Sequence, residues 1–161
     1  MTRISPAPQR FERRVDGVAY GVLDELVGYA LRRAQIAIYE DFEQALGPLE
    51  MTPQRFSAMV IIAANGGITQ AMLGRVLGIA RSGVVQVVNG LQQRGWVARE
   101  THGDDARAWL LVLTVNGRRR LANARRRVRA HDRRVAAPLD DAERATLIAL
   151  LGRLGAPTED D

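Results

Sequence analysis

The segment from residue 69 to residue 113 constrains the fold of this chain more than any other part of it. Its helical pattern stops twice, at Gly78 and at Gly95, and two runs of β-forming residues follow at 96–99 and 109–113. Glycine directly after a helical pattern ends a helix, and paired β-forming runs around a polar turn form a hairpin. The segment is therefore predicted to fold as helix, turn, helix and hairpin, in that order.

This order is typical of a winged helix-turn-helix, in which the second helix enters the major groove of duplex DNA. We expect a mainly α fold with a small β-hairpin wing (α+β), in which the remaining helices support this unit and pair it with a second copy. The expected parts are a flexible N-terminal arm at 1–17, a helical dimerisation region at 18–50 and 114–155, a winged helix-turn-helix DNA-binding domain at 51–113, and an acidic tail at 156–161.

Two helical patterns predict the dimerisation region. Apolar residues recur every three or four positions from Tyr20 to Leu46, which predicts one helix of about 27 residues and about 40 Å. A narrow seam from Leu121 to Val135 repeats with heptad spacing and is expected to meet a partner helix. His131 lies in this seam and is expected to be a satisfied interface residue, with a role in pH sensitivity as the alternative.

The helices before the second helix of the motif are expected to bury one stripe each. Thr52-Pro53 and Thr69 are start signals for these two helices, because threonine caps a helix and proline is tolerated in its first turn. The residues expected in the core are Phe56, Met59, Val60, Ala63, Leu73, Val76 and Leu77.

The second helix of the motif has one side without formal charge. That side carries Ser82, Val85, Gln86, Asn89 and Gln93. Gln and Asn pair with the major-groove edge of adenine, and a valine methyl packs against the methyl group of thymine. Arg81 and Arg94 flank this side and are predicted to hold phosphates. The alternative is an ordinary solvated helix face.

The polar stretch at 101–108 is predicted to be the tip of the hairpin. Arg107 in this tip would place a guanidinium in the minor groove, where narrow A·T tracts have the strongest negative potential. Asp105, two residues earlier, would orient Arg107. The alternative is a surface loop with an ion pair worth about 0–1 kcal/mol.

Charge and the residue types that are absent limit the function classes. Residues 111–135 carry nine arginines and one acid, a basic centre that suits a polyanion, although pairing with the acidic ends explains it equally well. The chain has no cysteine, which excludes disulfides and thiolate zinc sites. It has no apolar run of about 18 residues and no secretory signal, so we expect a cytoplasmic protein without a membrane span.

Catalytic chemistry is not predicted. The only histidines are His102 and His131, and no nucleophile elbow, P-loop or dinucleotide-binding glycine pattern occurs. Neighbouring carboxylates such as Asp104 and Asp105 do not form a catalytic pair. We therefore expect no enzyme, no cofactor and no metal.

Residues 49–121 resemble the MarR family of bacterial transcription regulators. The motifs that carry the resemblance are Thr69-Gln70, Leu77-Gly78, Arg81-Ser82-x-Val84, Leu91-x-x-Arg94-Gly95, Asp104-Asp105-x-Arg107 and Leu113-Thr114-x-x-Gly117. The resemblance implies an obligate homodimer with its recognition helices in successive major grooves and its wings in the flanking minor grooves.

Together with the patterns above, the resemblance implies a set of DNA-binding residues, with Asp105 as wing support. The set is Thr69, Gln70, Arg81, Ser82, Val85, Gln86, Asn89, Arg94 and Arg107. Many family members sense small aromatic or phenolic effectors between the dimerisation and DNA-binding regions. Tyr39, Phe42 and Met59 are candidates to line such a cavity here, with core packing as the alternative.

We therefore expect a sequence-specific regulator that binds double-stranded DNA, a ligand-responsive repressor acting as a homodimer on an inverted repeat. The alternative is a winged-helix module that binds small molecules or proteins without specific DNA readout. The uncharged recognition side and two helix glycines motivate this alternative. Gln86 stands where arginine is frequent, and Gly83 and Gly90 each lower helix propensity by about 1 kcal/mol relative to alanine.

Overall fold

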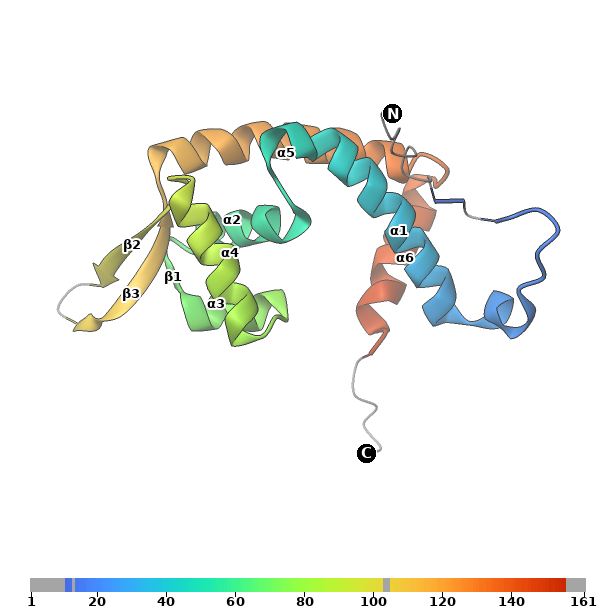
Figure 1. Ribbon diagram of the computed structural model, residues 1–161, viewed down its shortest axis with the longest axis horizontal. Coiled ribbons are helices and arrows are strands. Elements are labelled where there is room, and N and C mark those ends of the chain that lie inside the picture. The colour runs from blue at the N-terminus through green and yellow to red at the C-terminus, as the bar shows by residue number, and fades with distance from the viewer. Residues whose placement is uncertain (1–10, 13, 103–104, 156–161) are drawn as a thin grey trace, which may run out of the picture.

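The molecule is a chain of helices with a small sheet at one end (Figure 1). This computed structural model describes residues 11–12, 14–102 and 105–155, without the side chains of 102 and 105–108. The tail predicted at 156–161 lies outside the described residues, as do residues 1–10 and 13 of the predicted arm.

The long N-terminal helix predicted from Tyr20 to Leu46 is divided in two. A short 3₁₀ helix, η1 (Gly21–Glu25), precedes α1 (Val27–Leu46), and the extended backbone of Leu26 separates them. The prediction of one continuous helix was therefore wrong. Apolar residues keep their spacing across the break, so the pattern alone does not reveal it. A second 3₁₀ turn, η2 (Gly47–Leu49), follows α1.

The part predicted to bind DNA begins with α2 (Pro53–Ala64) and continues with β1 (Ile68–Thr69), α3 (Gln70–Leu77) and α4 (Arg81–Gln93). Thr52 caps α2, because its side chain accepts a hydrogen bond from the backbone N–H of Arg55 at 3.2 Å. The helix start predicted from Thr52-Pro53 is thus confirmed.

The wing is a three-stranded antiparallel sheet with strand order β1-β3-β2. Its hairpin strands, β2 (Val97–His102) and β3 (Asp105–Leu113), extend well into the stretch predicted to be a loop tip at 101–108. That expectation was wrong because polar residues on an exposed hairpin can pair their backbones as fully as apolar ones. The wing is therefore a longer arm than the sequence pattern predicted.

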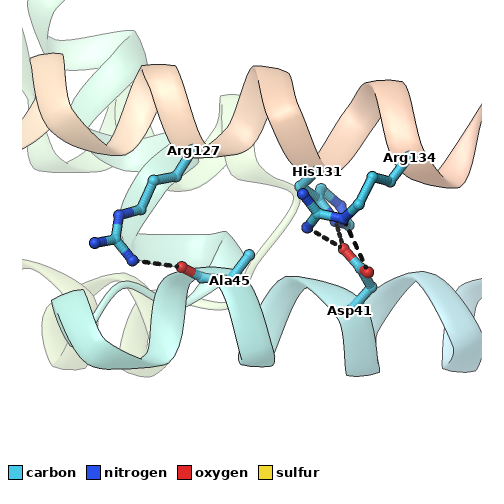
Figure 2. A network of polar contacts seen from close by, with 5 residues as sticks. All are labelled: Asp41, Ala45, Arg127, His131 and Arg134. Carbon is cyan, nitrogen blue, oxygen red and sulfur yellow. Dashed lines mark hydrogen bonds and ion pairs between the residues drawn. The ribbon is translucent and has the colours of Figure 1, made fainter.

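Two helices complete the chain, α5 (Val115–Val135) and α6 (Asp141–Arg153). Both helices begin at a capping residue: Thr114 Oγ1 accepts from the N–H of Gly117 at 2.9 Å, and Asp140 forms a capping box with Glu143. α5 runs along α1 of the same chain (Figures 1 and 2). The seam from Leu121 to Val135, which was predicted to meet a partner helix, therefore has one within its own chain.

The core lies where α2, α3, α4, the sheet and the first half of α5 meet. Its largest fully buried side chains are Leu46, Met59, Ile62, Leu73, Val88, Leu91 and Leu111. Two residues expected in the core are exposed instead, Ala63 and Val76, the latter to 56%. In α2, Ala58 and Ile62 are buried where Ala63 was expected to be. In α3, Gly74 takes the inward position, because Val84 of α4 packs directly against it.

α6 contributes nothing to this core. None of its residues is buried, and even its large apolar side chains are open to solvent: Ile148 is 60% exposed and Leu150 is 49% exposed. In Figure 1, α6 follows the end of α5 that lies away from the sheet. No single helix in the described ranges is long and apolar enough to cross a membrane.

Candidate nucleic-acid interface

The turn between α3 and α4 sets the shape of the candidate interface. The two helix axes bend by 113° at the turn, within the range typical of DNA-binding helix-turn-helix units. Thr69 begins α3 by accepting from the N–H of Met72 at 3.2 Å. Gly78 ends α3 with φ +63°, a left-handed conformation that glycine adopts without strain.

Close packing of α3 on α4 holds this angle. A Cβ atom added to Gly74 would lie 3.2 Å from Cγ1 of Val84, so a larger side chain would push the helices apart. On the inner side of α4, Val84, Val88 and Leu91 are almost fully buried. This packing leaves the other side of α4 free to face a partner.

The outer side of α4 carries the residues predicted to read bases. Ser82, Gln86, Asn89 and Gln93 are exposed, and Val85 is half-buried at the edge of this side. No side chain in the described part of the chain forms a hydrogen bond with any of these five. The structure therefore brings the predicted polar stripe together on one surface.

A second basic residue lies beside Arg81, which was predicted to hold phosphate. Arg75 in the last turn of α3 and Arg81 in the first turn of α4 are both exposed. They flank an open hollow of about 680 Å³ between the two helices, which Gln70 and Ile79 also line. Arg75 was not predicted from the sequence, although a lone arginine on a helix of small and apolar residues was a usable signal.

Arg94, the other predicted phosphate contact, makes internal contacts. Its Nη1 donates to the carbonyl of Gly90 at 3.0 Å, and its Nε lies 3.3 Å from a carboxylate oxygen of Glu50. Its guanidinium also stacks 5.8 Å from the centre of the Trp96 ring. These contacts favour a structural role at the end of α4 over the phosphate contact that the sequence suggested.

Gln70 and Thr69 connect α3 to the wing. Thr69 pairs with Leu110 in the β1–β3 ladder, and its hydroxyl already caps α3. Gln70 Oε1 accepts a hydrogen bond from Nη2 of Arg99 on β2 at 3.0 Å. Both residues therefore help to hold the wing beside the helix-turn-helix, in addition to the DNA contacts predicted for them.

Only the backbone of the wing residues Asp105 and Arg107 is described. Both lie in β3, whose first residue, Asp105, pairs with His102. The pairing of their side chains, predicted from the sequence, lies outside the described residues.

The end of α4 is joined to the start of α5 by a close backbone contact. The N–H of Thr114 donates to the carbonyl of Trp96 at 3.1 Å, and the Thr114 hydroxyl donates to the carbonyl of Gly95 at 2.6 Å. A Cβ atom on Gly117 would lie 1.9 Å from the Trp96 carbonyl oxygen. The wing, α4 and α5 therefore meet at a point where only glycine fits.

A network of polar contacts joins the other end of α5 to α1 (Figure 2). Nδ1 of the buried His131 lies 2.6 Å from Oδ1 of Asp41, and Nη2 of Arg134 donates to the same oxygen at 2.8 Å. The hydrogen bonds from Arg134, and then from His131, hold the pKa of Asp41 below its ordinary value. His131 is thus a satisfied residue, as expected, but its partner is in its own chain.

A hollow beside α1 is a candidate site for a small molecule. Its volume is about 290 Å³, and its lining includes Tyr20, Tyr29 and Arg33. The Arg33 guanidinium lies 5.0 Å from the Tyr20 ring centre and donates to the Tyr29 hydroxyl at 3.1 Å. Arg33 Nη2 is buried, and no described residue accepts a hydrogen bond from it.

The cavity predicted around Tyr39, Phe42 and Met59 has less support. Phe42 and Met59 are 7% and 0% exposed and belong to the core, whereas Tyr39 is 44% exposed. Their burial fits the alternative of core packing. The Arg33 hollow was missed because it forms where η1 meets the first turns of α1, and the sequence pattern predicted one continuous helix there. Within the described ranges, no three His, Asp or Glu side chains gather as metal ligands.

Comparison with known proteins is consistent with this geometry. The sequence profile described as MarR family matches residues 49–108. A protein of Thauera aromatica, whose name proposes that it regulates the hcr operon, is 36% identical over 138 residues, 85% of this chain and 83% of the relative.

Solved structures extend the likeness to most of the chain. The transcriptional repressor CouR bound to a 23-mer DNA duplex is 36% identical, with a TM-score of 0.79, over 84% of this chain and 96% of that one. CouR has also been solved with p-coumaroyl-CoA, at 33% identity and a TM-score of 0.79, over 88% and 99%. Rv2887 of Mycobacterium tuberculosis in complex with salicylic acid is 28% identical, with a TM-score of 0.65, over 81% and 96%.

Proposed function

This chain belongs to the MarR family of winged helix-turn-helix transcriptional regulators, and we propose that it is a homodimeric repressor released from its operator by a small aromatic ligand. The observation that carries the proposal is the polar outer side of α4, held clear of the core by the α3–α4 turn. In helix-turn-helix proteins this side of the second helix reads the major groove. The protein is thus a DNA-binding regulator and not an enzyme.

A mobility-shift experiment on the intergenic DNA beside its own gene tests the DNA-binding part of the proposal. A protein that makes several phosphate contacts loses affinity by orders of magnitude between 50 and 200 mM salt. We expect a shift at 50 mM salt that weakens steeply by 200 mM. A weak shift that is independent of DNA sequence would favour the alternative of a winged-helix module without specific readout.

Exposed apolar surface supports the homodimer. Large apolar side chains are exposed on η1, on the first half of α1 and on α6, a surface that a monomer would leave in water. They include Val22, Leu23, Leu26, Val27, Leu31, Leu147, Ile148, Leu150, Leu151 and Leu154. Two copies related by a two-fold axis would bury these side chains and present two recognition helices to half-sites about 10 bp apart.

Sedimentation of the purified protein tests the dimer. The parent is expected to sediment as a dimer, and Ile148→Asp is expected to sediment as a monomer, because a buried unpaired carboxylate opposes association. Gln44→Asp, a charge placed on the exposed part of α1 outside this apolar surface, is the control and should remain dimeric. A parent protein that is monomeric at all concentrations would refute the pairing.

The hollow beside Arg33 supports a small aromatic effector. It combines aromatic walls with a positive charge, which suits a compound that has a ring and an anionic group. CouR and Rv2887 have been solved with p-coumaroyl-CoA and with salicylic acid, compounds of that kind. The dimer would have two conformations that differ in the spacing of the recognition helices. An effector changes the DNA affinity only if it binds one of these conformations more tightly than the other.

Titration of salicylate and p-coumaroyl-CoA into the protein–DNA complex tests the effector and its site. We expect at least one of them to release the DNA. Tyr29→Ala should weaken the response if the Arg33 hollow is the site, whereas Tyr39→Ala should weaken it if the cavity proposed from the sequence is the site. Equal responses in both variants and the parent would refute both sites.

A further inference from the structure

The outermost face of α4 is a continuous stripe of uncharged polar side chains. Successive residues of an α-helix are rotated by about 100°, so Ser82, Gln86, Asn89 and Gln93 fall within an arc of about 60°. This arc is opposite the buried side, which holds Val84, Val87, Val88 and Leu91. All four stripe residues are exposed.

The stripe contains one hydroxyl group, three carboxamides and no charge. The basic residues nearest to it lie at its ends. Arg81 begins α4, and Arg94, which follows α4, is held by Gly90, Glu50 and Trp96. No guanidinium is therefore available along the part of α4 that would face base edges.

The carboxamides are spaced to meet neighbouring base pairs. Gln86 and Gln93 are separated by about 10 Å along the helix axis, at 1.5 Å per residue. Base pairs are stacked at about 3.4 Å, so the stripe from Gln86 to Gln93 spans about three of them. Asn89 lies between the two glutamines and faces the same way.

Carboxamide chemistry selects one base over the others. A carboxamide presents a donor and an acceptor side by side, which matches the N7 acceptor and the N6 donor of adenine. Guanine presents two acceptors, N7 and O6, so the carboxamide oxygen would oppose one of them. An arginine, with two donors, is the matching side chain for guanine.

Val85 extends the same preference. It is half-buried at the edge of the stripe, one residue before Gln86, so part of its side chain remains free to contact a partner. The methyl group of thymine is the apolar feature of the major groove that valine can contact. Adenine paired with thymine supplies both features in one base pair.

We propose that α4 reads a short run of A·T base pairs in each half-site, with Gln86 and Asn89 bonded to adenine and Val85 against thymine. This inference rests on the proposed DNA-binding function and names the sequence class that the same surface selects. Specificity here comes from matched donor–acceptor pairs, while Arg81 at the start of α4 supplies a contact that does not depend on sequence.

Selection of binding sites from a randomised duplex library tests the proposal with the full-length protein. The parent should select A·T pairs at two or three adjacent positions of each half-site. Gln86→Arg should change the preferred base at one of these positions from adenine to guanine. Gln54→Arg, which places the same charge on the exposed surface of α2 and not on α4, is the control and should leave the selected bases unchanged.

A chemical change in the DNA provides the second measurement. Replacing adenine by 7-deazaadenine at the selected positions removes the N7 acceptor but keeps the Watson–Crick pair. We expect the affinity of the parent to fall about 5-fold or more at each contacted adenine, in line with the discrimination of bidentate pairs. When the replaced base is the adenine that Gln86 contacts, Gln86→Ala should bind the adenine DNA and the 7-deazaadenine DNA with nearly equal affinity.

The outcomes separate this inference from the function on which it rests. Selection of a G·C core that Gln86→Arg leaves unchanged would overturn the A·T readout and leave the regulator function intact. Enrichment of no sequence at all, together with no salt-dependent shift, would overturn both.

Discussion

The junction between the wing and α5 permits a sharp prediction about Gly117. In Gly117→Ala, the new Cβ atom would lie 1.9 Å from the carbonyl oxygen of Trp96, whereas an ordinary contact begins near 3.4 Å. The start of α5 would have to move away by about 1.5 Å, since the obstacle is backbone and cannot rotate aside. The two hydrogen bonds of Thr114 to Gly95 and Trp96 would break with this movement.

The expected cost follows from these contacts. Each lost hydrogen bond is worth about 1 kcal/mol, and overpacking beside the buried Trp96 adds about 1–3 kcal/mol, which gives a destabilisation of about 4 kcal/mol. For a chain of this length, 1 kcal/mol shifts the melting temperature by about 2–4 °C. We therefore expect Gly117→Ala to melt about 10 °C below the parent.

Thermal unfolding followed by circular dichroism measures this difference, at one protomer concentration because dimerisation adds to stability. Gly83→Ala is the matched control. Its Cβ would lie 3.7 Å from the nearest atom, and alanine should raise stability by up to about 1 kcal/mol in a helix. If Gly117→Ala melts within about 2 °C of the parent, the close contact does not constrain the junction.

Three further predictions concern single side chains. Arg94→Ala should lower the free energy of unfolding by about 1–2 kcal/mol while the salt dependence of DNA binding stays the same; a slope reduced by about 1 would show a phosphate contact instead. Arg107→Ala should weaken operator binding in a mobility-shift assay, and unchanged affinity would remove the wing arginine from the interface. The pKa of Asp41 is lowered in the folded state by Arg134 and then by His131, so its contribution to stability is present above the unfolded pKa of about 3.9 and is lost as pH falls through the folded pKa. Urea unfolding should accordingly show that acid weakens the parent more steeply than Asp41→Asn, and parallel curves would contradict this linkage.

Sequence patterns predicted the elements with strong local signals. The caps at Thr52 and Thr69 and the end of α3 at Gly78 depend on residues within one helical turn, and all three are confirmed. The outer side of α4 was also predicted, because its uncharged polar residues recur at helical spacing, and Ser82, Gln86, Asn89 and Gln93 are exposed together.

The errors arose where distant parts of the chain decide the outcome. Val76 is exposed because α4 packs on α3 at Gly74 instead, through Val84. This contact joins two helices, so the periodicity of one helix alone cannot reveal it. Arg94 was predicted to hold phosphate from its place beside the polar stripe, and this stays a prediction. Its contacts with Glu50 and Trp96 depend on how η2 and β2 fold back onto α4. The Arg33 hollow likewise depends on the break at Leu26, which places η1 beside the first turns of α1.

One consequence follows from the length of α5. This single helix of 21 residues is anchored at Gly95 and Trp96 by its first turn and at Asp41 by its last, and Asp132 near its end forms an ion pair with Arg144 of α6. It works as a rigid lever about 30 Å long. A tilt of about 10° at the α6 end would therefore carry the wing about 5 Å, more than the 3.4 Å step between neighbouring base pairs. In a dimer, a modest rotation at the subunit boundary is thus enough to move the two α4 helices out of register with the half-sites of the operator.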